Sequence, residues 1–533
     1  MSLISLTFAI FFAAVLLLYY LLPRVTQPYL LLAASLVFYL WSGPKYIAYI
    51  AVSASVTYAA ALLAGRTSSR FAAVSAELKS SLPPEEYKKK AAAAARKGRL
   101  IIGLALAVDL AILVVIKYLD FILGNILPLF GGAAARFAGL RLVMPLGLSY
   151  FTFGAVGYLI DVSRGKYPAE RNFAKFALYM TYFPHIIQGP IPRFDKLAPQ
   201  FSVPHAFDID RILDGFRLIL WGCFKILMLS ASLAPAVSAM ADSHASMGGL
   251  EIWLRMTAWG LQLYADFSGG IDIVTGVSEC FGIGLEENFR RPYFATDLTD
   301  YWNRWHISLS GWLKDYVFYP MALSKRFARF SKYLKKKHGK FIAKTVPVGL
   351  LSILLFTLVG LWHGANWGEI LFGVFNGVII MTSTLLEPLF QKIRKPLKMD
   401  SLLIWRIFRS LRTFIVITLT RVISRAPGIP AAMSFYRKMF TSPGIGGFIS
   451  EFSEGGRFAG FDILSYLPVF IGAAALFAVS LTEEITPSHS VRKLLSERPV
   501  LRVALEVLCV AVIVVFGTYG LGYDASGFIY AGN

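Results

Sequence analysis

The sequence VPVGLLSILLFTLVGL, residues 346–361, runs directly into WHGANW, residues 362–367. The first part has no charged residue and is typical of a helix that spans a lipid bilayer. His363 follows at its end. A histidine at membrane depth costs free energy unless it has a partner or a task, so His363 is a candidate functional residue.

Further apolar stretches extend this pattern over the whole chain, which has 533 residues, 56% of them hydrophobic and only 16% charged. Together they predict roughly 11 to 13 membrane elements, some of them re-entrant because they are short. The clear stretches are 4–22, 46–64, 100–123, 215–240, 346–361, 372–386, 464–481 and 500–520. The weaker ones are 29–41, 142–160, 173–187, 253–270 and 405–420.

These elements predict an all-α, multi-pass membrane protein in the plasma membrane. No polar stretch is long enough to form a separate water-soluble domain, so we expect one membrane domain over residues 1–533. Within it we expect N-terminal helices in 1–126, a core that carries the motifs in 145–376, and C-terminal helices in 402–520.

The formal net charge of +21 does not indicate nucleic-acid binding, because the basic residues lie between the apolar stretches. Segment 66–99 has nine Lys or Arg and three acidic residues, and segment 325–344 has nine and no acidic residue. Segment 392–412 adds seven. This asymmetry is the positive-inside pattern, which predicts cytoplasmic loops near anionic membrane lipid. Within the first of them, the alanine-rich run 88–99 predicts a charged helix.

A second histidine, His306, lies in YWNRWHISLSGWLKDY, residues 301–316. The stretch from 145 to 376 mixes apolar runs with Trp, Arg, Asp and Asn, and such polarity inside a membrane protein indicates an internal site. A neutral imidazole can take a proton from a hydroxyl group and return it to a leaving thiol. We therefore assign catalysis to His363 and His306, although packing against a neighbouring helix would also explain either residue.

Substrate-binding roles are assigned to five residues near these motifs: Asn303, Arg304, Trp305, Trp362 and Asp266. For Asp266 and Asp272, in DFSGGID, ion pairing or helix packing is the alternative. No metal site is expected, because the two histidines are far apart in sequence and no His-Glu-x-x-His motif occurs. The chain also has no Gly-x-Ser-x-Gly elbow, Walker A motif or dinucleotide fingerprint.

The motifs PLGLSYFTF, DFSG, ENFRRPY, WNRWHISLSGWLKDYVFYP and LWHGANW resemble, in this order, the membrane-bound O-acyltransferase (MBOAT) family. The resemblance is to its bacterial branch of alginate O-acetyltransferases and teichoic-acid D-alanyl transfer proteins. It implies helices around a central tunnel, with the signature histidine at His363 and the second polar position at His306. Two positions depart from many relatives, which have histidine at Asn376 and arginine at Asn303.

The resemblance also implies the reaction partners. The donor would be an acyl thioester of coenzyme A or of a carrier protein on the cytoplasmic side, with no bound cofactor. The acceptor would be a hydroxyl group of an extracellular polysaccharide, cell-wall glycan or teichoic acid. A secreted or membrane-anchored acyltransferase would assist, and membrane lipid would surround the protein.

We therefore predict an O-acyltransferase that transfers acetyl to a polysaccharide or cell-wall polymer. D-alanyl transfer to teichoic acid is an alternative, favoured by the basic insert 325–344. Acyl transport without chemistry is a second alternative, although the chain lacks the two matching halves with broken helices that are typical of transporters.

Overall fold

The computed structural model is helical almost throughout, which confirms the all-α prediction. The one exception among the described residues is a hairpin of two short strands, β1 (Arg457–Phe458) and β2 (Phe461–Asp462). The described residues are 1–126, 144–238, 240, 247–446, 449, 453, 457–458, 461–486 and 491–519.

Eight helical segments among the described residues are long and apolar enough to cross a membrane, so the chain is a multi-pass membrane protein. They are Arg24–Ser42, Pro44–Ser81, Pro84–Asn125, Ile209–Ser238, Lys325–His363, Trp367–Arg394, Leu464–Ile485 and Pro499–Phe516. The shorter apolar helix α1 (Leu6–Leu21) precedes them.

The 11 to 13 membrane elements expected included short, re-entrant ones, and several weaker stretches indeed form helices too short to count among the eight spans. Stretch 142–160 gives α5 (Leu148–Ser163), which has only 16 residues. Stretch 173–187 is broken, since α6 (Phe173–Thr181) ends before α7 (Phe183–Ile186), which carries Pro184 in its first turn.

The chain clusters into two compact units. The first comprises residues 1–216 and 274–286, and the second comprises 217–273 and 287–533. The expected division into 1–126, 145–376 and 402–520 stays a prediction.

The first unit contains α1, α5, α6 and α7 together with α2 (Gln27–Ser42), α3 (Ile47–Ser81), α4 (Pro84–Ile126), α8 (Phe194–Leu197) and the start of α9 (Ile209–Phe224). The last turns of α11 (Gly249–Cys280) also belong to it.

The second unit continues from α9 through a π-helical turn (Lys225–Ser230) and α10 (Ala231–Ser238) into most of α11. The site region follows, with α12 (Leu298–Arg304), α13 (Ile307–Leu313), a second π-helical turn (Lys314–Phe318), α14 (Tyr319–Ala322), α15 (Lys325–His363) and α16 (Trp367–Arg394). The remaining helices are α17 (Leu403–Arg425), α18 (Ile429–Thr441), α20 (Leu467–Ile485), α21 (Val491–Ser496) and α22 (Pro499–Phe516).

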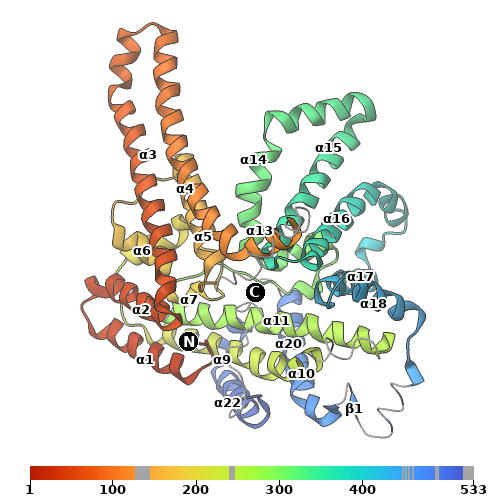
Figure 1. Ribbon diagram of the computed structural model, residues 1–533. Coiled ribbons are helices and arrows are strands. Elements are labelled where there is room, and N and C mark those ends of the chain that lie inside the picture. The colour runs from red at the N-terminus through yellow and green to blue at the C-terminus, as the bar shows by residue number, and fades with distance from the viewer. Residues whose placement is uncertain are drawn as a thin grey trace. The chain divides into compact units, whose positions relative to one another are not determined.

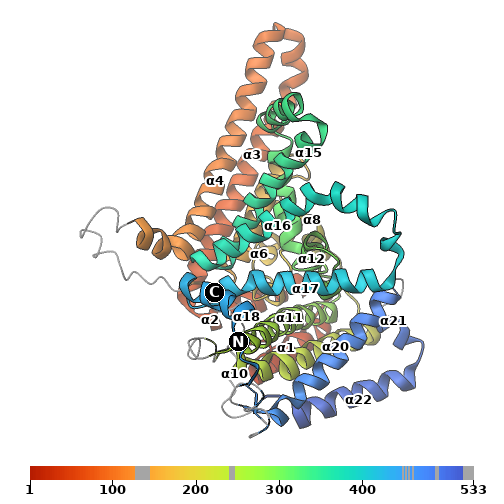
Figure 2. The same cartoon turned by 90° about the vertical axis from the view of Figure 1, so that its right-hand side faces the viewer.

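The basic segment 66–99 is part of a long helical hairpin, which confirms the charged helix expected over 88–99, and the rest of the segment, expected as a loop, is almost entirely helical as well. Helices α3 and α4 run side by side (Figures 1 and 2), and only residues 82–83 separate them. At 1.5 Å per residue α4 is about 64 Å long, about twice the thickness of a bilayer core. The basic half of the hairpin therefore extends beyond the membrane.

The other basic segment, 325–344, is likewise helical and forms the first half of α15. Gly339, with a φ of 85°, interrupts its helical geometry between the basic half and the apolar half. A residue without Cβ adopts this conformation without strain. The interruption lets the basic half take its own direction outside the membrane.

Helices α15 and α16 pack tightly against each other and bring His363 to the end of their hairpin. A Cβ atom added at Gly360 would collide with the carbonyl oxygen of Glu369, and one at Gly373 with that of Phe356. Glycine therefore permits the close approach of the two helices. Asn366 then starts α16, because its side chain accepts a hydrogen bond from the Glu369 N–H at 2.9 Å.

We expect Gly373→Val to lower the thermal stability of the purified protein, because the two helices must separate to admit the side chain. Overpacking of this kind costs about 1–3 kcal/mol. Gly103→Val on α4 is the matched control, since a Cβ there meets no atom within 4 Å. Equal unfolding temperatures of the two variants, measured in the same detergent, would contradict the close packing.

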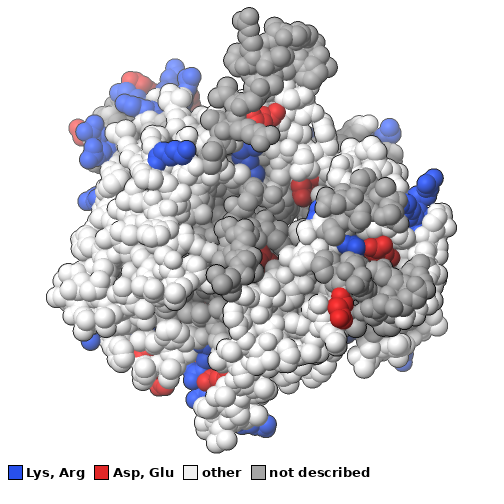
Figure 3. Space-filling model, turned by 60° about the horizontal axis from the view of Figure 1, so that its bottom comes forward, with Lys and Arg blue, Asp and Glu red and all other residues white. Residues whose placement is uncertain are grey.

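Uncharged atoms cover wide areas of the face drawn in Figure 3, between a few acidic and basic side chains. Helix α22 illustrates the same property in its composition, because none of its residues is buried and Val500 is 84% exposed. An apolar helix that exposes its side chains in this way is suited to contact lipid.

Candidate active site

His363 is the last residue of α15 and is half-buried. Its ring lies beside Trp362, with 4.8 Å between the ring centroids, and 6.5 Å from Phe372 of α16. The glycine-mediated packing of α15 and α16 thus fixes where this histidine lies.

His306 lies at the junction of α12 and α13 and is only 1% exposed. Its φ of 47° is in the left-handed region, which a residue with a Cβ adopts at a cost. The neighbouring backbone holds it there, since the Ile307 N–H donates to the Asn288 carbonyl at 3.0 Å and the Arg290 N–H to the Arg304 carbonyl at 2.9 Å. Strain of this kind persists where the surrounding structure fixes a functional geometry.

Asn288 of the ENFRRPY motif fixes the protonation of the His306 ring. Its Oδ1 accepts hydrogen bonds from the Ser308 N–H at 3.1 Å and from the Ser308 hydroxyl at 2.8 Å, and it lies 3.2 Å from His306 Nδ1. Because a backbone N–H can only donate, the Asn288 atom at this position must be the oxygen. His306 Nδ1 must then carry the proton, and Nε2 has the free lone pair.

His306 Nε2 is buried and has no hydrogen-bond partner among the described residues. A buried acceptor without a partner is rare in native proteins and marks a place where a ligand or a water molecule is bound. The lone pair of Nε2 is therefore free to accept a hydrogen bond from a substrate hydroxyl.

Aromatic rings enclose His306. Phe267 of α11 meets its ring edge-on at 4.8 Å, and Trp362 lies 5.2 Å from it. Trp362 thus contacts both histidines, and the two belong to one site in the second unit. Rings at this distance exclude water from the imidazole, and exclusion of water protects a thioester from hydrolysis.

Burial lowers the pKa of His306 well below its ordinary value, because the charged imidazolium loses its hydration. The electrostatic effect of the neighbouring His363 lowers the pKa further. Both effects favour the neutral ring, so His306 stays a free base at physiological pH and below it.

Trp305 and Arg304 of the predicted substrate-binding set directly precede His306 and pack or pair with other residues of the second unit. Trp305 is buried and stacks on Tyr301, with 5.7 Å between ring centroids and 17° between ring planes. Arg304 donates to Asp300 at 2.8 Å and to Glu484 at 3.0 Å. Because these two ion pairs occupy the guanidinium group, Arg304 serves to orient α12.

The predicted substrate-binding residues Asn303 and Asp266 differ in their exposure. Asn303 is exposed, and its Oδ1 accepts a hydrogen bond from Lys314 at 2.7 Å. Asp266 is buried on α11 and accepts a hydrogen bond from the Ser230 hydroxyl at 3.3 Å, which agrees with a role in helix packing.

Glu484 at the end of α20 gathers three arginines around the site loop. Its carboxylate pairs with Arg291 at 2.9 Å, with Arg304 at 3.0 Å and with Arg406. Arg291 has a φ of 46°. It therefore adopts the left-handed backbone conformation, as His306 does. A single acidic residue from a distant helix thus stabilises the loop that carries His306.

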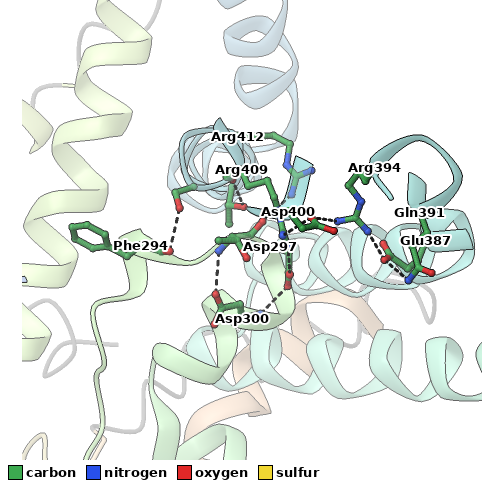
Figure 4. A network of polar contacts seen from close by, with 12 residues as sticks. Phe294, Asp297, Asp300, Glu387, Gln391, Arg394, Asp400, Arg409 and Arg412 are labelled. Carbon is green, nitrogen blue, oxygen red and sulfur yellow. Dashed lines mark hydrogen bonds and ion pairs between the residues drawn. The ribbon is translucent and has the colours of Figure 1, made fainter. Parts of the chain in front are cut away.

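A second polar network anchors the start of α12 (Figure 4). Asp297 caps this helix by accepting from the Asp300 N–H at 2.9 Å, and it pairs with Arg409 of α17 at 3.3 Å. Arg409 also lies 3.8 Å from Asp400, which pairs with Arg394 of α16 at 3.4 Å. The short helix before His306 is therefore tied to both α16 and α17.

Sequence reasoning missed three residues that shape the site: Asn288, Phe267 and Lys225. Lys225 was detectable, because it and Arg217 are the two charged residues within the apolar stretch 215–240. It is buried and donates to Ser268 at 2.9 Å and to Asp272 at 2.7 Å, which confirms the ion pair expected for Asp272. The pair fixes the segment of α11 that places Phe267 against His306.

We expect Asn288→Ala to lower the rate of acyl transfer about tenfold to a hundredfold, because His306 loses the acceptor that sets its tautomer. Asn288→Asp keeps an acceptor oxygen and should restore much of the rate. Its negative charge favours the imidazolium and raises the pKa of His306, so the acidic limb of the pH–rate profile should move to higher pH. An unchanged profile in the Asp variant would contradict the contact.

No group of three or more His, Cys, Asp or Glu side chains suited to a metal ion occurs in the described part of the chain. The site is therefore described by its histidines, its aromatic walls and the polar residues that hold them.

The sequence model of the membrane-bound O-acyltransferase family matches residues 163–334. A probable alginate O-acetylase of Azotobacter vinelandii is 31% identical over 431 residues, which cover 80% of this chain and 74% of the relative. The peptidoglycan O-acetyltransferase of Helicobacter pylori is 28% identical over 373 residues, 65% of this chain and 66% of the relative. The teichoic acid D-alanyltransferase of Streptococcus thermophilus is 29% identical over 239 residues, 44% of this chain and 55% of the relative. The chain belongs to the membrane-bound O-acyltransferase family and is an acyltransferase of the bacterial plasma membrane.

Proposed function

We propose that the protein transfers an acetyl group from a cytoplasmic thioester to hydroxyl groups of an extracellular polysaccharide or cell-wall polymer. The observation that carries the proposal is the buried Nε2 of His306, a free base beside Trp362 and His363. A water-poor site with two histidines suits the transfer of an acyl group between a thiol and a hydroxyl.

His363 acts as the general base in this mechanism. Its imidazole takes the proton of the acceptor hydroxyl while the oxygen attacks the carbonyl carbon of the thioester. The carbon–sulfur bond then breaks, and the leaving sulfur receives the proton from the imidazolium. The products are an ester and a free thiol, and the imidazole is neutral again.

His306 assists this step as a second neutral base. Asn288, which Ser308 holds in place, contacts Nδ1 of its ring, and Nε2 has no partner among the described residues. We assign to it the orientation of the acyl group or of the acceptor hydroxyl against His363. The acyl donor is a thioester of coenzyme A or of a carrier protein, and a tunnel between the helices leads the acyl group toward the outer side.

Several relatives support acetyl as the group. The alginate relatives of Azotobacter vinelandii and Pseudomonas aeruginosa are named O-acetylases and match 80% and 63% of this chain. The D-alanyltransferase of Bacillus subtilis matches 50%. D-alanyl transfer to teichoic acid is the second candidate, favoured by the basic half of α15, and in either case a secreted or membrane-anchored partner completes the transfer.

The experiment that tests the proposal compares cells that carry the chain with cells that lack it. Esters are released from surface polymers by mild alkali and identified by mass. Acetate that depends on the chain is the expected result. D-alanine would support the second candidate, and equal release from both cell types would contradict acyl transfer to a surface polymer.

A further inference from the structure

A large basic cleft lies in the first unit, whereas His306 and His363 belong to the second. It has a volume of about 1100 Å³ and is lined by residues of α3 and α4 and of the end of α5 with the segment that follows it. Its basic side chains are Arg66, Arg70, Arg99, Arg164 and Arg171, and we call it the arginine cleft. Ligand pockets typically measure about 300–1,000 Å³, so the cleft can hold a molecule of cofactor or lipid-headgroup size.

Four of the five arginines of the cleft keep their charge unpaired among the described residues. None of its lining residues is acidic. The side chains of Arg66, Arg70, Arg99 and Arg171 have no ion pair among the described residues. The neighbouring Glu170 is engaged elsewhere, since it accepts from the Arg171 and Asn172 N–H groups at 2.8 and 2.9 Å and pairs with Lys175. Like charges gathered around one cavity attract an anion.

The kind of basic residue in the cleft indicates which class of anion it binds. The lining contains five arginines and no lysine, although Lys88, Lys89, Lys90 and Lys97 lie on the same helix α4. Guanidinium groups bind phosphate in a bidentate manner, whereas ammonium groups act as point charges. The composition therefore favours phosphate groups over a general negative surface.

The cleft lies where the apolar helices end. Arg66 comes directly after the apolar stretch 46–64 of α3, and Arg99 directly precedes the stretch 100–123 of α4. Leu62 and Ile102 line the same cavity on the apolar side. Phosphate groups at the boundary of the bilayer lie at this depth, with hydrocarbon below them.

We propose that the arginine cleft binds a phosphate-bearing ligand at the basic, cytoplasmic surface of the membrane. The source is either the headgroup of an anionic phospholipid or the nucleotide phosphates of coenzyme A. The apolar lining at Leu62 and Ile102 suits the acyl chains of a lipid. The coenzyme A source rests on the proposed function, whereas the lipid source does not.

Binding to the purified full-length protein in detergent tests the proposal without any activity measurement. Native mass spectrometry reports the binding of cardiolipin, phosphatidylglycerol and coenzyme A, with phosphatidylcholine as the neutral probe. In Arg66→Gln/Arg99→Gln we expect the affinity for the bound anionic probe to fall at least about tenfold. The matched control is Arg96→Gln/Lys97→Gln, which removes the same charge from α4 outside the cleft.

A steric variant provides an independent check. A side chain at Gly98 would enter the cleft without a clash, because a Cβ there meets no atom within 4 Å. Gly98→Phe should therefore reduce binding as strongly as loss of the arginines, while Gly103→Phe, equally open but outside the cleft, should not. Unchanged unfolding temperatures establish that both variants fold.

The pattern of probes identifies the source. Binding of the anionic phospholipids alone assigns the cleft to a lipid headgroup, and displacement of lipid by coenzyme A assigns it to the nucleotide phosphates. Equal loss of binding in the cleft variant and the control would overturn the proposal, because the attraction would then be spread over the basic hairpin. Absence of binding by every anionic probe would overturn it as well.

Discussion

Replacement of His363 by alanine should lower the rate of acyl transfer by about 10²–10⁴-fold, the contribution typical of a general base. His306→Ala should have an effect of similar size, because its ring contacts Trp362, which also contacts His363. Groups that act as one unit are not additive, so the double variant should be no slower than the slower single variant. The measurement is ester formed per amount of protein in isolated membranes.

His338→Ala is the matched control for this prediction. His338 lies on the same helix as His363 but is exposed in its basic half. Its replacement should leave the rate unchanged. Multiplication of the two single effects in the double variant would contradict a shared site, even if each single variant were slow.

Lys225→Met should destabilise the protein strongly, because it leaves Asp272 without its cation at 2.7 Å. Loss of one partner of a buried ion pair costs about 3–5 kcal/mol. Lys225 is only 3% exposed, whereas the side chain of Asp272 is 25% exposed, so water offsets part of this cost. The expected result is a large decrease in the thermal unfolding temperature of the purified protein.

The double variant Lys225→Met/Asp272→Leu should recover most of this stability, since no unpaired charge remains. Asp272→Leu alone is the reciprocal control. If Lys225→Met unfolded at the temperature of the unmodified protein, the ion pair would not stabilise the packing of α11. The position of Phe267 against His306 would then need another explanation.

The membrane class and the position of His363 could be predicted from local sequence. An uncharged stretch followed by His363-Gly364 defines a helix and its end, and α15 ends at this histidine. In the basic segment 66–99, helix formers predicted the helix over 88–99, whereas the helix over 66–81 was missed, since charge bias reports the side of the membrane and not the backbone conformation.

The assembly around His306 could not be predicted in the same way, because it depends on long-range contacts and on an unusual backbone conformation. Arg304 meets Glu484 across 180 residues, and no local pattern indicates that pairing. The left-handed conformation of His306 is equally unexpected for a residue with a Cβ. Tertiary packing imposes both features.

Asn376 has a clear structural task. It is fully buried on α16, accepts a hydrogen bond from the Trp302 indole at 3.2 Å and donates to the Phe372 carbonyl at 2.8 Å. An amide can perform both tasks at once. Asn376 therefore connects α16 to α12, the helix that precedes His306.

The ester content of surface polymers in living cells shows whether His363 is the base in acyl transfer to a surface polymer. Cells without the chain, with the intact chain and with His363→Ala are compared at equal amounts of protein in the membrane. If His363 is the base, alkali-labile acyl esters should be found with the intact chain alone. Full ester content with His363→Ala would contradict it, because the histidine at the end of α15 would then not be the base.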